Sequence, residues 1–130
     1  MTGGDGFGSF LKQHREFFNA LDEDGWEAVD GFEGIETKVL SGSFDHAKSE
    51  GAVTRITRWA AGTVSPEPSV HEWCEEVFIV SGTLSIGTPE NEQDVLTTGT
   101  YAVRPPNVPH GPFFTKDGCV MVEFLYYPPA

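Results

Sequence analysis

The segment PSVHEWCEEVFIVSG, residues 68–82, decides the fold and the candidate site together. Its second half is rich in β-branched and aromatic residues, which is typical of a β-strand. Because side chains on a strand alternate between its faces, a strand that is regular from His71 to Glu75 points both side chains the same way, and Val77 and Ile79 continue that face. Burying an imidazole and a carboxylate beside aliphatic side chains costs free energy unless the polar pair shares a partner. A metal ion is one such partner, so this strand face is a candidate metal site.

A second segment, GTYAVRPPNVPHGP at residues 99–112, supplies another histidine. Proline cannot donate to a strand ladder, so Pro105, Pro106 and Pro109 exclude a central strand and predict an irregular loop. His110 lies between Pro109 and Gly111 and has little freedom, which suits a preorganised ligand. Two histidines and one carboxylate with open coordination positions form the arrangement that non-haem Fe(II) oxygenases use.

The rest of the chain favours an all-β fold with one N-terminal helix. The predicted strands are 35–40, 52–59, 75–80, 83–86, 101–104 and 119–127, and Ser81-Gly82 predicts a tight hairpin between two of them. Many short strands favour a closed barrel or jelly roll. Apolar residues spaced three and four apart predict an amphipathic helix that ends near residue 21. We therefore expect a flexible leader at 1–8, the helix and a connection at 9–34, and a barrel at 35–130.

The two quoted segments resemble the paired motifs of the cupin superfamily. Cupins are small β-barrels, also described as double-stranded β-helices, that usually hold one divalent metal. The residues that match the motifs are Gly62, His71, Glu75 and Gly82 in the first, and Gly99, Pro105 and His110 in the second. The phrases GTY at 99–101, RPP at 104–106 and DGC at 117–119 look closest to the ChrR-type branch. That branch is similar to the acetylacetone-cleaving dioxygenase and to the cupin domain of a zinc-dependent anti-sigma factor.

By this resemblance, His71, Glu75 and His110 are the ligands of one divalent transition metal, with Fe(II) favoured and Zn, Mn or Ni as alternatives. The sequence departs from the family at Ser69, which replaces the first histidine of the motif triplet. A hydroxyl is a poor substitute for imidazole at such an ion, so the centre has three protein ligands and is completed by water or substrate. The competing interpretation is a cupin without metal, in which His71 and Glu75 hydrogen-bond to each other and to Ser69.

Further candidates surround these ligands. Glu123, if it points inward, supplies a contact behind the ligands, a base or a fourth ligand, and a solvated strand glutamate is the alternative. Tyr101 is a second candidate for moving a proton. Arg55 and Arg58 take opposite strand faces, so one of them could hold an anionic substrate group, with a surface ion pair as the alternative. The expected pocket suits a small apolar or aromatic oxygenated compound. Its predicted wall residues are Ser69, Val77, Ile79, Phe114 and Met121.

These features predict a metal-dependent, dioxygenase-like enzyme with a small-molecule substrate. One alternative is a non-oxidative isomerase, cyclase or lyase, in which the metal acts as a Lewis acid and Glu123 or Tyr101 moves a proton. The other is a non-catalytic module that senses a small molecule or a metal. Fold alone does not choose among them, because one barrel hosts many chemistries.

The charge and the cysteine content of the chain restrict the partners and the location that we expect. The 130 residues carry a net charge of −12, which repels phosphate backbones and anionic lipid, so nucleic acid and membrane partners are not expected. The first residues lack a secretory signal pattern, and Cys74 and Cys119 are no disulfide framework, so we expect a cytoplasmic protein. Aromatic residues at the outward positions 78, 124 and 126 predict a homodimer.

Overall fold

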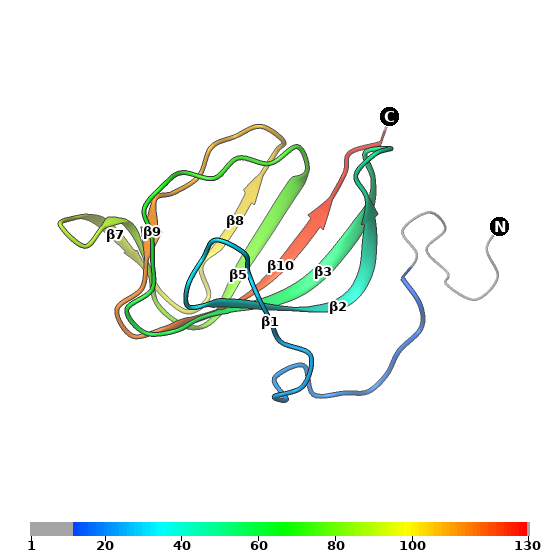
Figure 1. Ribbon diagram of the computed structural model, residues 1–130, viewed down its shortest axis with the longest axis horizontal. Helices are drawn as coiled ribbons and strands as arrows, with labels where there is room; N and C mark the ends of the chain where they lie inside the picture. Colours follow the sequence, from blue (N-terminus) through cyan, green and yellow to red (C-terminus); the bar gives the residue numbers. More distant parts are fainter. Residues whose placement is uncertain (1–11, 130) are drawn as a thin grey trace.

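Residues 12–129 are described by a computed structural model, in which strands form two antiparallel sheets (Figure 1). The larger sheet contains, in spatial order, β1 (Glu27–Ala28), β2 (Ile35–Asp45), β3 (Glu50–Trp59), β10 (Cys119–Tyr126), β5 (Cys74–Gly82) and β8 (Tyr101–Arg104). The smaller sheet contains β4 (Val64–Ser65), β9 (Phe113–Phe114), β6 (Leu84–Thr88) and β7 (Asn91–Leu96). The all-β barrel that the sequence predicts is confirmed.

Strand β5 carries the inward face that the sequence predicts. Glu75, Val77 and Ile79 are buried, whereas Phe78 and Val80 are exposed. The apolar interior is a cluster of buried side chains contributed by β5, β6 and β10, and Glu75 lies beyond this cluster at the start of β5. The cluster consists of Val77, Ile79, Leu84, Cys119 and Met121. Strand alternation therefore places the Glu75 carboxylate on the interior face of the barrel, at the end of its apolar cluster.

The N-terminal helix is absent from the part of 9–21 that the structure describes. Residues 12–19 have no regular secondary structure, and Phe17, on the predicted apolar stripe, is 97% exposed. A short helix is marginal in water unless its apolar face packs against the rest of the protein, and this stretch lacks that packing. Residues 1–11, which include the predicted leader, lie outside the described residues.

The predicted hairpin at Ser81-Gly82 is also wrong, because β5 and β6 belong to different sheets. Gly82 has a φ of 77°, and a Cβ atom there would clash with the carbonyl oxygen of Gly118, beside the start of β10. Only glycine combines this φ with so close a backbone approach. The chain therefore bends at Gly82 from the larger sheet into the smaller one.

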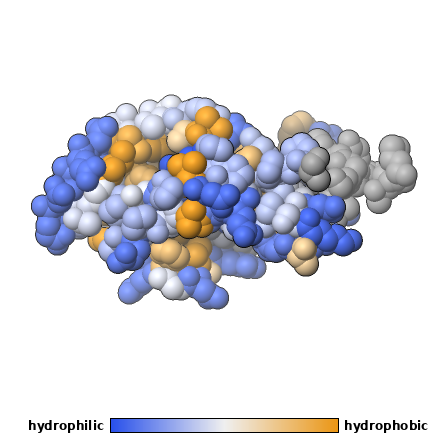
Figure 2. Space-filling model, turned by 90° about the horizontal axis from the view of Figure 1, so that it is seen from above, coloured by the Kyte–Doolittle hydropathy of each residue, from blue (hydrophilic) through white to orange (hydrophobic). Residues whose placement is uncertain are grey.

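The outer surface is dominated by hydrophilic residues. On the face shown in Figure 2, apolar side chains gather in separate patches among charged and polar ones. Within residues 12–129, no helix is long and apolar enough to span a bilayer.

Candidate metal centre

The two histidine segments are joined at the mouth of the barrel by backbone hydrogen bonds. Ser69 and His110 form an isolated antiparallel bridge, with N–O distances of 2.7 and 2.8 Å. Asn107, whose φ of 66° turns the proline-rich loop, donates its backbone N–H to the carbonyl of His71 at 2.7 Å. The predicted irregular loop is confirmed, and it fixes His110 opposite His71.

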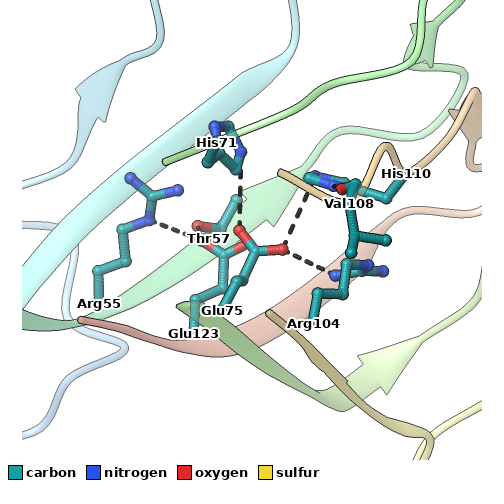
Figure 3. A network of polar contacts seen from close by, with 8 residues as sticks. All are labelled: Arg55, Thr57, His71, Glu75, Arg104, Val108, His110 and Glu123. Carbon is teal, nitrogen blue, oxygen red and sulfur yellow. Dashed lines mark hydrogen bonds and ion pairs between the residues drawn. The ribbon is translucent and has the colours of Figure 1, made fainter. Parts of the chain in front are cut away.

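The donor atoms of His71, Glu75 and His110 all lie within 4.8 Å of one another (Figure 3). His71 Nε2 is 3.8 Å from Glu75 Oε2, and His110 Nε2 is 3.7 Å from Glu75 Oε1. These distances are too long for hydrogen bonds, so the hydrogen bond between His71 and Glu75 that the competing interpretation requires is not formed. Donors about 2.1 Å from a tetrahedral ion lie roughly 3.4 Å apart, so the three donors, of the right types and slightly more widely spaced, could close around one metal ion.

Burial and charge favour neutral imidazoles here. Burial lowers the pKa of His71, and the Glu75 carboxylate opposes this effect only in part. Burial also lowers the pKa of His110, and the guanidinium of Arg104 lowers it further. Neutral imidazole is the form that ligates metals, so both rings are poised to bind. Burial raises the pKa of Glu75, and the charge of Glu123 reinforces this, whereas Arg104 opposes it.

Arg104 is a site residue that the sequence reasoning missed. Its Nη1 donates to Glu75 Oε1 at 2.7 Å, because the register of β5 and β8 places Arg104 directly opposite Glu75. The pair leaves Glu75 Oε2 free of hydrogen-bond donors within the described residues. Strand parity gave no signal for Arg104, because the larger apolar residues of this strand, Tyr101 and Val103, are the exposed ones.

Glu123 points inward, as one of the two interpretations of its strand requires. Its Oε1 accepts hydrogen bonds from Arg55 Nε at 2.6 Å and from Thr57 Oγ1 at 2.7 Å. Glu123 does not belong to the group of converging donors, but its side chain lines the same cavity. Thr57 is a contact that the sequence reasoning did not identify.

Two arginines on β3 separate as expected. Arg55 enters the cavity, whereas Arg58 faces outward, where its Nε donates to Glu36 at 2.9 Å and its guanidinium lies over Trp26 at 4.0 Å. The sequence left two roles open for these arginines, one inside the cavity and one in a surface ion pair. Arg55 takes the first position and Arg58 the second.

Trp73 supports the first ligand. Its ring stacks on the imidazole of His71 at 4.7 Å between centroids and 6° between planes. Its indole Nε1 is buried and has no hydrogen-bond partner within the described residues. The stack restrains the rotation of the His71 ring.

The ligands line a cavity of about 190 Å³. Ser69, Val77 and Met121 contribute to its wall as predicted. Two other predicted wall residues, Ile79 and Phe114, are buried in the packing of the barrel and do not line the cavity. The wall is also more polar than predicted; its polar and charged members besides the ligands are Thr37, Arg55, Thr57, Ser65, Ser69, Arg104 and Glu123.

Tyr101 does not reach the site. It is 53% exposed on the outer face of β8, opposite Phe78, and its hydroxyl donates to Glu76. The proton-transfer role predicted for it has no structural basis. A larger surface hollow, about 1110 Å³, lies between residues 28–36 and 117–120 and contains none of the three ligands.

Comparisons with known proteins place this geometry in context. The family model described as the ChrR Cupin-like domain matches residues 14–127. An RmlC-like cupin from Shewanella frigidimarina is 19% identical with a TM-score of 0.64, covering 91% of this chain and 95% of its own. The polyketide cyclase RemF from Streptomyces resistomycificus is 18% identical with a TM-score of 0.64, covering 89% and 83%. An acetylacetone dioxygenase from Acinetobacter johnsonii is 17% identical with a TM-score of 0.61, covering 88% and 76%. Such identities establish the fold alone, and no curated protein matches significantly.

Proposed function

The chain belongs to the ChrR cupin-like family, and from this premise we propose that it is a metal-dependent, dioxygenase-like enzyme acting on a small oxygenated compound. His71, Glu75 and His110 would hold one divalent transition metal. Fe(II) is favoured, because two imidazoles and a carboxylate with open positions suit that ion. When bound, such an ion supplies Lewis acidity and a site for oxygen chemistry.

The observation that carries the proposal is the convergence of three donor groups on one point of a half-enclosed cavity. A glutamate that is only 5% exposed needs compensation, and Arg104 engages one of its oxygens. The other oxygen remains for a second cation. Two imidazoles that burial keeps neutral complete the set.

The other residues of the chain prepare the site for substrate. Arg104 fixes the orientation of Glu75, and Trp73 fixes that of His71. Ser69 brings a short side chain to the position where the family has a histidine, which leaves room for a substrate oxygen. Val77 and Met121 exclude water from the inner end of the cavity.

A non-oxidative reaction, such as an isomerisation or cyclisation, is the second candidate. Glu123 favours it, because its Oε2 lacks a hydrogen-bond donor within the described residues and the side chain lines the cavity. A carboxylate in that position can accept a proton from a bound substrate. Structural similarity to a polyketide cyclase and to a dioxygenase is compatible with either reaction.

Metal analysis of the purified protein tests the proposal. The protein is loaded with Fe(II) or Zn(II) under anaerobic conditions, and its metal content is measured by inductively coupled plasma mass spectrometry. We expect about one equivalent of metal per chain. His110→Ala should lose most of it. His14→Ala is the matched control, because the side chain of His14 is exposed and pairs only with Glu16 among the described residues.

Failure of the wild-type protein to bind any added metal would overturn the proposal. If metal binds, oxygen consumption with a panel of β-diketones and phenols separates the two candidates. Uptake of oxygen supports the dioxygenase-like reaction, and substrate conversion without uptake supports the non-oxidative one.

A further inference from the structure

The charged side chains that line the cavity cancel one another. Two guanidiniums, from Arg55 and Arg104, face two carboxylates, from Glu75 and Glu123, and the imidazoles that ligate a metal are neutral. A divalent ion held by the proposed ligands therefore leaves the cavity with an uncompensated double positive charge. In a small, partly enclosed space such a charge favours an anionic ligand over a neutral one.

Arg55 is placed to receive that anion. Its Nε is fixed by Glu123 at 2.6 Å, which orients the guanidinium. Its two terminal nitrogens have no acceptor within hydrogen-bond distance in residues 12–129, and its side chain is 31% exposed. Figure 3 shows the free end of Arg55 pointing away from Glu123, toward the level of His71.

Arg104 has a different role. Its Nη1 is occupied by Glu75, and its side chain lies on the side of Glu75 away from Arg55 (Figure 3). The planar fork of an arginine with free terminal nitrogens binds a carboxylate through two parallel hydrogen bonds. Arg55 meets that condition on both terminal nitrogens.

We infer that the substrate of this site is a small carboxylate-bearing anion, whose carboxylate is held by Arg55 while a second oxygen occupies the open side of the His71–Glu75–His110 centre. This inference rests on the proposed function and adds a substrate class to it. The cavity of about 190 Å³ limits the molecule to a few carbon atoms beyond these oxygens. Phe32 and Phe113, which also line the cavity, provide an apolar wall for them.

The test compares two probes of equal size, acetoacetate and its neutral amide, acetoacetamide. Binding is measured by titration calorimetry to the full chain loaded with Zn(II), which is redox-inert, and to the metal-free chain. Hydrogen bonds to charged groups are worth enough that we expect acetoacetate to bind about tenfold more tightly than the amide. Arg55→Gln should remove about that factor for acetoacetate and leave the affinity for the amide within about twofold.

Arg58→Gln is the matched control, because it removes the same charge from the outer face of the same strand. It should leave both affinities unchanged. Arg55→Lys should be intermediate, because it keeps the charge and loses the fork. If Arg55→Gln does not fold, the double variant Arg55→Gln with Glu123→Gln keeps the pair neutral and takes its place.

Equal binding of the two probes, no binding of either, or a preference that survives Arg55→Gln would overturn the inference. Metal content and binding to the metal-free chain together separate failure of the inference from failure of the proposed function. In a protein that takes up no metal, a preference for acetoacetate that depends on Arg55 would support the carboxylate site at Arg55 and overturn the proposed function. Stoichiometric metal without any such preference overturns the inference and leaves the proposed function intact.

Discussion

Replacing Arg104 by methionine isolates the electrostatic support of the candidate ligand Glu75. Methionine keeps most of the length and apolar surface of the side chain and removes the guanidinium. The ion pair between Arg104 Nη1 and Glu75 Oε1 is 2.7 Å long, and the two side chains are only 20% and 7% exposed. The substitution therefore leaves a buried carboxylate without its nearest cation.

The size of the effect follows from this burial. Removing one partner of a fully buried pair costs about 3–5 kcal/mol. The cost should be smaller here, because Arg104 is partly open to water and Glu75 can take up a proton. We expect Arg104→Met to lower the free energy of unfolding at pH 8 by about 2–3 kcal/mol. Arg58→Met breaks an ion pair with Glu36, whose side chain is 41% exposed, and should cost no more than about 1 kcal/mol.

The loss depends on pH in a defined direction. Burial raises the pKa of Glu75 above 4.5, so the folded protein holds more protons than the unfolded chain just above that value. Stability linked to this group is present below pH 4.5 and is lost as the pH rises through its folded pKa. Arg104 opposes the rise, so its removal raises the pKa of Glu75 further. The destabilisation should therefore be larger at pH 8 than at pH 5.

Urea unfolding, followed by tryptophan fluorescence in the presence of a chelator, measures both the loss of unfolding free energy and its dependence on pH. The wild type, Arg104→Met and Arg58→Met are compared at pH 5 and pH 8. An Arg104→Met destabilisation that is the same at both pH values, or no greater than that of Arg58→Met, would refute the reasoning.

Three further predictions concern other parts of the barrel. Trp73→Leu removes the stack on His71, so we expect metal affinity, measured by competition with a chelator, to fall about two- to tenfold. An unchanged affinity would show that Trp73 does not position His71. Burial raises the pKa of Cys119 to about 11, so stability should fall as the pH rises from 9 to 11, and iodoacetamide should not label this thiol in the folded protein at pH 8. Mass spectrometry of the labelled peptide checks this, and rapid labelling would contradict it. The exposed Phe78 lies beside the edge strand β8, and we propose that this face pairs with a second copy of the chain, so Phe78→Asp should give a monomer by light scattering. A monomeric wild type would refute the pairing.

The convergence of the three candidate ligands was predicted from strand alternation, from the prolines around His110 and from the resemblance to the cupin motifs. Side-chain alternation on β5 places Glu75 on the interior face, whereas His71 lies before this strand begins at Cys74, so alternation does not extend to it although it lies within reach of Glu75. The prolines around His110 confine it to a loop, and loops at the end of a barrel face its mouth. Neither inference requires knowledge of which strands are neighbours.

Contacts between distant segments could not be predicted in the same way. Arg104 meets Glu75 only because β8 is the neighbour of β5, and Thr57 meets Glu123 only because β3 is the neighbour of β10. The hairpin prediction failed for a related reason. Glycine is typical of a tight turn, but at Gly82 the chain passes from one sheet to the other. Strand β7 was missed because nearly all its residues are exposed, which leaves no alternation to detect.

The isolated bridge between Ser69 and His110 separates the behaviour of the site from that of the barrel. Three backbone hydrogen bonds join the segments that carry the histidines, two at this bridge and one from Asn107 to His71, whereas β10 is paired along its length with strands on both sides. The amides of Ser69 and His110 should consequently exchange with solvent through small local openings, long before the amides of β10 exchange through global unfolding. A ligand that spans the two histidines would close these openings, so hydrogen exchange at two residues would report occupancy of the site while the barrel remains unchanged.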